Sequence, residues 1–123
     1  MGKQDVNEVR LSGTAGDDVK FGRAITGKEY CTFSLCVVPY NKKHGDNEDE
    51  MSRSVNYIRI IVFNNRHTRN VDYLRSMNFH RGQRVSVFGW LSSRKTEIKG
   101  NNIIQLSVVV RKIEIEQTKQ QRK

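Results

Sequence analysis

Three segments of this chain alternate apolar side chains with other side chains at a period of two, and this alternation restricts the fold more than any other feature. The three segments are Tyr30 to Val38, Val55 to Phe63 and Arg84 to Leu91. Because successive side chains of a strand point to opposite faces, each segment predicts a strand with one face in a core. In the second segment, that face carries Ile58, Ile60 and Val62.

A further strand and one helix are expected from weaker patterns. The strand lies near Val6 to Thr14 and is followed by a region rich in glycine and charge, from Gly16 to Gly27. Asn41 to Arg53 is polar throughout and predicts a long loop. Between Asn65 and His80 the apolar period changes to three, which predicts a short helix with Val71, Leu74 and Met77 on one side.

The last predicted strand runs from about Ile103 to Glu116. Leu106, Val108 and Val110 share one parity, whereas Ile113 and Ile115 take the other. An extra residue in one strand of a pair shifts the parity in this way, so we expect a bulge near Arg111.

The predicted order is strand, strand, strand, helix, strand, strand. An all-β chain with one short helix between its third and fourth strands is typical of the OB fold, a five-stranded, partly open Greek-key barrel. An SH3-like barrel or a small sandwich remains an alternative from the pattern alone. We expect one domain over residues 1–116, followed by a short basic tail over residues 117–123.

The charge of the chain favours an anionic partner. It has 22 Lys and Arg against 13 Asp and Glu, a net charge of +9 and a pI near 9.9. A domain this basic attracts polyanions, so nucleic acid and an anionic membrane surface are the first candidates. No apolar run approaches the length of a membrane span, and the N-terminus lacks a secretory signal, so we expect no membrane partner.

We expect neither a metal, a cofactor nor catalysis. Cys31 and Cys36 fall on opposite faces of one predicted strand, so they cannot bridge each other, and they lack the spacing of a zinc site. Both are interpreted as reduced packing residues in a cytosolic type of compartment. The sequence has no glycine-rich phosphate motif and no nucleophile beside a base, so we expect a protein that is not an enzyme.

The non-core face of the strand over Val55 to Phe63 carries the candidate binding residues. Tyr57 and Phe63 flank Arg59 on this face, and Tyr40 could join them from the end of the neighbouring strand. Aromatic rings edged by cations suit single-stranded nucleic acid, because unpaired bases stack on the rings while phosphates meet the cations. We therefore predict stacking by Tyr40, Tyr57 and Phe63.

Six basic residues are candidate phosphate contacts. Arg94 and Lys95 stand in SSRKTEIKGNN, which predicts a hairpin-like loop with Gly100 at its tip. The six candidates are Lys20, Lys42, Lys43, Arg59, Arg94 and Lys95.

Phe88 and Trp90 take the non-core side of their strand, because Val85, Val87 and Leu91 supply its core side. Exposed apolar patches mark interfaces, so we expect these two residues to join copies of the chain in a homo-oligomer. An alternative from another functional class is that the aromatic face of Tyr57 and Phe63 is itself only a protein interface.

The motifs resemble the single-stranded DNA-binding proteins of bacteria and mitochondria (the SSB family). The similar segments are NEVRLSGTAGDD, CTFSLCVVPY, VNYIRIIVF and YLRSMNFHRGQRVSVFGWLSSRK, in that order. The resemblance implies an OB fold, stacking at Tyr40, Tyr57 and Phe63, and sequence-independent binding that protects exposed strands in replication, recombination and repair. It also implies a homotetramer or dimer in the cytoplasm or nucleoid, with a mitochondrial, phage or plasmid origin left open.

The chain departs from the family pattern in several places. Tyr40 and Tyr57 stand where tryptophan is common, Thr96 falls near the position of a further family aromatic, and Trp90 takes a usually polar position. The chain ends in the basic TKQQRK, without the acidic tip by which bacterial members recruit replication enzymes. A primosomal replication protein or a single-stranded RNA binder of the same fold remains an alternative.

Overall fold

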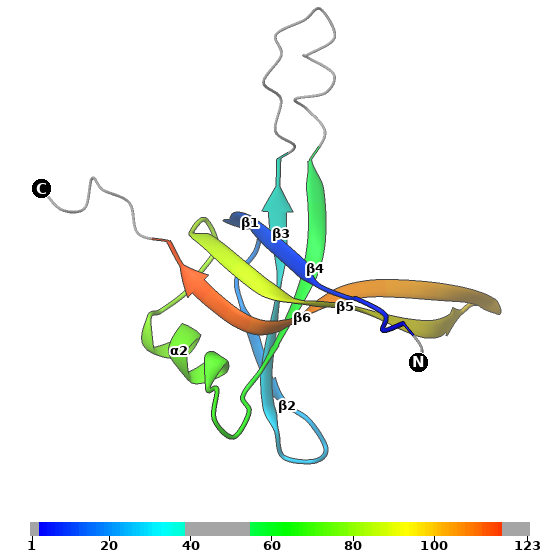
Figure 1. Ribbon diagram of the computed structural model, residues 1–123, viewed down its shortest axis with the longest axis horizontal. Helices are drawn as coiled ribbons and strands as arrows, with labels where there is room; N and C mark the ends of the chain where they lie inside the picture. Colours follow the sequence, from blue (N-terminus) through cyan, green and yellow to red (C-terminus); the bar gives the residue numbers. More distant parts are fainter. Residues whose placement is uncertain (1–2, 39–54, 117–123) are drawn as a thin grey trace, which may run out of the picture.

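The computed structural model describes residues 3–38 and 55–116 (Figure 1). The strands are β1 (Val9–Ala15), β2 (Lys20–Arg23), β3 (Glu29–Val37), β4 (Asn56–Phe63), β5 (Arg84–Ile98) and β6 (Asn101–Ile115), and the helix is α2 (Asn70–Ser76). The predicted loop over Asn41 to Arg53 and the predicted tail over 117–123 lie outside the described residues.

The strands form a closed barrel. Their order is β1-β5-β6-β4-β3-β2, and the end of β1 also pairs with β3, where Thr14 faces Cys36 and Ala15 faces Leu35. Five strands thereby close on themselves and β2 extends the sheet from the outer edge of β3. The one helix lies between β4 and β5 in the sequence, as the OB fold requires. The predicted OB-fold barrel is confirmed.

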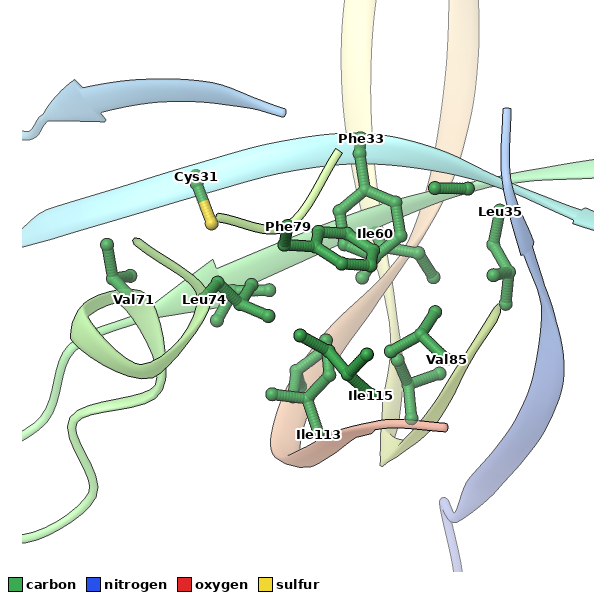
Figure 2. Close-up of a cluster of buried hydrophobic side chains, with 14 of the residues drawn as sticks. Cys31, Phe33, Leu35, Ile60, Val71, Leu74, Phe79, Val85, Ile113 and Ile115 are labelled. Carbon is green, nitrogen blue, oxygen red and sulfur yellow. The ribbon is translucent and has the colours of Figure 1, made fainter. Parts of the chain in front are cut away.

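The core occupies the inside of this barrel, as predicted for the inner faces of β3 and β4. Leu35, Ile60 and Val62 are fully buried. The rings of Phe33 and Phe79 meet edge to face, with centroids 5.1 Å apart. Figure 2 shows these side chains converging with those of α2 and of the end of β6. The strands whose alternation was visible in the sequence, β3, β4 and β5, each contribute buried side chains to this core.

The helix is shorter than the predicted segment. Val71 and Leu74 are fully buried, but Met77, predicted on the same side of the helix, follows the last helical residue and is 39% exposed. The next buried side chain is that of Phe79, at 5% exposure. The chain leaves the helical period at Ser76, and Asn78 follows with a positive φ of 55°. This turn redirects the backbone and brings Phe79 inward.

A buried asparagine outside α2 satisfies the first amides of the helix. Asn64 Oδ1 accepts hydrogen bonds from the backbone amides of Val71 (2.8 Å) and Asp72 (3.2 Å), and its Nδ2 donates to the Asp72 carboxylate. The amides at a helix start have no partner within the helix, and the N-cap residue Arg69 does not accept a side-chain hydrogen bond from them. The hydrogen bond from Asn64, followed by that from Arg69, lowers the pKa of Asp72. Asn64 thus fixes α2 to the end of β4.

Two features of the sheet differ from the sequence prediction. β2 was missed, because its four residues offer one apolar ring, Phe21, and a glycine rather than an alternating run. The predicted loop SSRKTEIKGNN is instead a continuation of β5 and β6, which pair as far as Ile98 and Asn101. Lys99 and Gly100 make the turn with positive φ values of 51° and 80°. We name residues 92–107 the hairpin arm; it projects from the side of the barrel opposite α2 (Figure 1).

The arm explains two further corrections. Leu91 was predicted to face the core and Leu106 shares the parity of core residues, yet they are 42% and 57% exposed. Both have the inward parity of their strands, but they lie where β5 and β6 leave the barrel and no opposite wall covers them. The first strand was predicted to start near Val6, but β1 begins at Val9, and Val6 is 80% exposed.

The predicted bulge in β6 is confirmed. Phe88 faces Lys112 and Gly89 faces Val110, so Arg111 is the additional residue that has no partner on β5. The extra residue moves Ile113 and Ile115 to the same inner side as Val110.

Candidate nucleic-acid interface

The candidate site is the non-core face of β3 and β4, which we name the outward face. Each outward side chain of one strand lies opposite one of the other. The pairs are Tyr57 with Cys36, Arg59 with Ser34, Ile61 with Thr32, and Phe63 with Tyr30. The predicted division of β4 into two faces is confirmed, because Ile60 and Val62 are fully buried whereas Tyr57 is 69% exposed.

The Tyr57 ring lies beside the backbone that follows β1. A Cβ added to Gly16 would be 3.6 Å from Cε1 of Tyr57, so the ring is in ordinary contact distance of this glycine. Two hydrogen bonds hold the segment in place: the Gly16 amide donates to the Ser34 carbonyl (2.7 Å), and the Ser34 amide donates to the Asp17 carboxylate (2.8 Å). The support comes from backbone at one side of the ring, and a large part of the ring remains open to a ligand.

Phe63 lies at the opposite end of β4 and has two neighbours that the sequence analysis did not identify. The ring of Tyr30 is 6.1 Å from the Phe63 ring between centroids, with an angle of 59° between their planes. The ammonium of Lys28 is 5.7 Å from the centroid of Phe63. The parity of Tyr30 was readable from β3, since it matches Thr32 and not the buried Cys31. Its position opposite Phe63 was not readable, because it depends on strand register.

The outward face extends across the sheet beyond β3 and β4. Lys20 of β2 lies opposite Thr32, which lies opposite Ile61; Ile61 pairs with Val109 of β6, and Val109 with Trp90 of β5. This row places the exposed Lys20 at one border of the outward face and Trp90 at the other. Arg59, also exposed, lies between Tyr57 and Ile61 on β4. The structure thus brings Lys20, Arg59, Tyr57 and Phe63 together on one surface.

Arg94 and Lys95, which the sequence analysis treated as a pair, point to opposite faces of the hairpin arm. Successive residues of a strand alternate, so Arg94 shares the face of Trp90 and lies opposite Gln105. Lys95 lies opposite Ile104, on the face that continues from the barrel interior. Both are exposed, but Arg94 alone has the parity of the outward face.

This difference in parity predicts unequal roles in phosphate contact. Arg94→Ala should lower the slope of log affinity against log salt for oligo-dT by about 0.7, the value for one phosphate contact on a single strand, and Lys95→Ala should leave it near wild type. Fluorescence anisotropy at several salt concentrations measures both slopes, with Lys95→Ala as the matched control of equal charge change. Equal losses for the two variants would contradict the assignment by strand parity.

Tyr40, Lys42 and Lys43 lie outside the described residues, and their roles in stacking and phosphate contact stay predictions.

Phe88 and Trp90 both occupy the outer side of β5, as predicted, with exposures of 45% and 36%. Phe88 borders a surface hollow over β1, β5 and β6 whose charged lining residues are Arg10, Lys112 and Glu114. The guanidinium of Arg111, the bulge residue, lies over the Trp90 ring at 5.6 Å from the ring centroid. The two aromatic residues are thus accessible to a partner.

The carboxylate of Glu116, beside this hollow, already has hydrogen-bond partners within the chain. Glu116 accepts hydrogen bonds from the hydroxyls of Ser12 (2.7 Å) and Ser86 (2.9 Å), and Arg84 lies at 3.4 Å. These bonds, with that from Ser12 the strongest cause, lower the pKa of Glu116. The contacts connect the end of β6 to β1 and β5. Their contribution to stability is present at neutral pH and is lost as the pH falls through the lowered pKa.

The described residues contain no group of three side chains that could hold a metal ion. No helix among residues 3–38 and 55–116 is long and apolar enough to cross a membrane. Cys31 and Cys36 are free thiols. Burial raises the pKa of Cys31 to about 12, against a smaller opposite effect of Arg75, so this thiol stays protonated in the core.

Comparisons with known proteins agree with this geometry. The model of the single-strand binding protein family matches residues 6–116. The chain is similar to a solved structure from Plasmodium falciparum, described as an SSB complex with ssDNA, with a TM-score of 0.69 and 20% identity. The alignment covers 94% of this chain and 96% of that one, which supports the same fold. A search of curated protein sequences gave no match.

Proposed function

Because the chain belongs to the single-strand binding protein family, we propose that it binds single-stranded DNA on the outward face with little sequence preference. The observation that carries this function is the placement of Tyr57, Arg59 and Phe63 along one exposed face of β4. Every base has a π-face, so stacking on these rings is tolerant of sequence, whereas a duplex hides the same faces between its base pairs.

The charge distribution supports the same function. The chain carries a net charge of +9; Arg59 is exposed on the outward face, Lys20 at its border, and Arg94 on the hairpin arm with the same parity. Cations in these positions meet the phosphates of a strand whose bases lie on Tyr57 and Phe63. The similar Plasmodium falciparum protein was solved in complex with ssDNA, which fits this partner. The protein then acts by binding alone and protects exposed strands during replication, recombination and repair.

A competition experiment tests this function. Labelled oligo-dT is bound to the protein at low salt and is then challenged with unlabelled oligo-dT or with duplex DNA of equal phosphate count. We expect the single strand to displace the label at a much lower concentration. Equal displacement would indicate plain charge attraction, and an absence of binding at low salt would leave the outward face as a protein interface.

We also propose that copies of the chain associate through Phe88 and Trp90, with a dimer or tetramer as the result. Both side chains are accessible, and burial in an interface would remove their apolar surface from water. Trp90→Ala should shift a wild-type oligomer toward smaller species in sedimentation velocity at micromolar concentration. A wild type that sediments as a monomer would contradict this proposal.

A further inference from the structure

Tyr30 is an aromatic residue of the outward face whose position core packing does not explain. It stands at the start of β3, directly opposite Phe63, while its neighbour Cys31 and the Cys31 partner Val62 fill the core. The Tyr30 and Phe63 rings, 6.1 Å apart, come from different strands and are tilted rather than stacked on each other. They therefore form a pair of adjacent surfaces on the outer side of the barrel.

A glycine in β2 makes room for this arrangement. Gly22 lies opposite Tyr30, and a Cβ added to Gly22 would be 2.8 Å from both Cζ and the hydroxyl oxygen of Tyr30. The phenol ring thus extends from β3 over the backbone of β2, in space that any other residue at position 22 would occupy. Gly22, Tyr30 and Phe63 form one row across three strands, so the outward face continues onto β2 at this end.

A cation lies beside the same two rings. The Lys28 ammonium is 5.7 Å from the Phe63 centroid and donates a 3.2 Å hydrogen bond to Oδ1 of Asn65. Lys28 is exposed and its bond joins two surface residues, so little holds the side chain in one conformation. It can reach a phosphate of a strand that lies on Phe63.

We propose that Tyr30, Phe63 and Lys28 form one nucleotide subsite, in which a base stacks on the two rings and Lys28 contacts its phosphate. The inference rests on the proposed binding of single-stranded DNA and extends it to two residues, Tyr30 and Lys28. The base takes the position of the Lys28 ammonium over Phe63, and the ammonium moves to the phosphate.

The subsite is distinct from the position of Tyr57. At a rise of about 3.3 Å per residue, Tyr57 and Phe63 are separated by about 20 Å along β4. Stacked bases of one strand are only about 3.4 Å apart, so the two ends of β4 hold nucleotides that are not adjacent. The loss of Tyr30 should then affect one end of the bound strand.

Substitutions at Tyr30 test the subsite. Tyr30→Ala should weaken oligo-dT binding by about 5-fold or more at fixed salt, the lower end of the effect of losing one stacked base. Tyr30→Phe keeps the ring and should bind like wild type, whereas Tyr30→Leu keeps apolar bulk without a π-face and should bind as weakly as Tyr30→Ala. Lys28→Ala should instead reduce the salt slope by about 0.7.

The matched control is Phe21→Ala. Phe21 is 44% exposed on β2, beside Gly22, but it pairs with the inward Cys31 and its ring lies under the Arg75 guanidinium at 4.5 Å. It therefore has the wrong parity for the outward face, and its loss should leave affinity unchanged. Circular dichroism and urea unfolding establish that each variant is folded.

The outcomes separate the subsite from the function on which it rests. If wild type fails to bind oligo-dT, the proposed function fails. If wild type binds and folded Tyr30→Ala or Tyr30→Leu binds equally well, the subsite is wrong and the function stands. A Tyr30→Phe variant as weak as Tyr30→Ala would also overturn the subsite, because the hydroxyl rather than the ring would then be required.

Discussion

Phe63→Ala and Tyr57→Ala should each weaken oligo-dT binding by about 5- to 150-fold at fixed salt. The range is the affinity equivalent of a stacking contribution of about 1–3 kcal/mol per base. That contribution is the one known for proteins that bind single strands, including single-strand binding proteins of this fold. Tyr57 is 69% exposed and Phe63 lies on the outward face, so removal of either ring deletes contact surface without opening the core. Fluorescence anisotropy on each purified variant measures the loss.

The salt dependence separates stacking from charge. Neither substitution removes a cation, so the slope of log affinity against log salt should remain near that of wild type. Arg59→Ala is the matched control, because Arg59 lies between the two rings on β4 and its loss should lower the slope. Folded ring variants that bind like wild type would show that the outward face has no stacking role.

Gly89→Ala should destabilise the fold by about 3 kcal/mol or more, at the upper end of what overpacking costs. A Cβ on Gly89 would lie 1.9 Å from the carbonyl oxygen of Val109, an atom of the β6 backbone in the centre of the barrel wall. Relief requires β5 and β6 to separate at the bulge that turns Ile113 and Ile115 inward. Urea unfolding followed by circular dichroism measures the change in the free energy of unfolding.

Gly16→Ala provides the comparison for this variant. Its added Cβ would be 3.4 Å from the Ser34 carbonyl oxygen and 3.6 Å from the Tyr57 ring, which are ordinary contacts. The free energy of unfolding should therefore change by less than about 1 kcal/mol, as for most tolerated substitutions. Equal stability of Gly89→Ala and Gly16→Ala would contradict the close packing of β5 on β6.

The sequence predicted the features that depend on local alternation. The inner faces of β3 and β4, the outward position of Tyr57 and Phe63, the fold class and the bulge at Arg111 all follow from side-chain parity. Parity is visible in a sequence because a buried face must stay apolar along the whole strand. The predictions made in this way are confirmed wherever the strand lies within the barrel wall.

The missed features depend on register and on where an element ends. The pairing of Tyr30 with Phe63 and the opposite faces of Arg94 and Lys95 need the alignment of β3 with β4 and the true length of β5. The exposed Leu91 shows the limit of parity, because an inward direction buries a side chain only where another wall faces it. No local pattern reports the point at which a strand leaves the barrel.

Photo-crosslinking tests the central claim most directly, since it locates the bound strand on the protein surface. Oligo-dT substituted with 5-iodouracil is irradiated in complex with the protein, and the crosslinked peptides are identified by mass spectrometry. We predict crosslinks at Tyr57 and Phe63 of β4, and at Tyr30 of β3, which lies opposite Phe63. Crosslinks at Phe21 or Tyr73, which lie off the outward face, without any at Tyr57, Phe63 or Tyr30 would contradict the proposed binding surface.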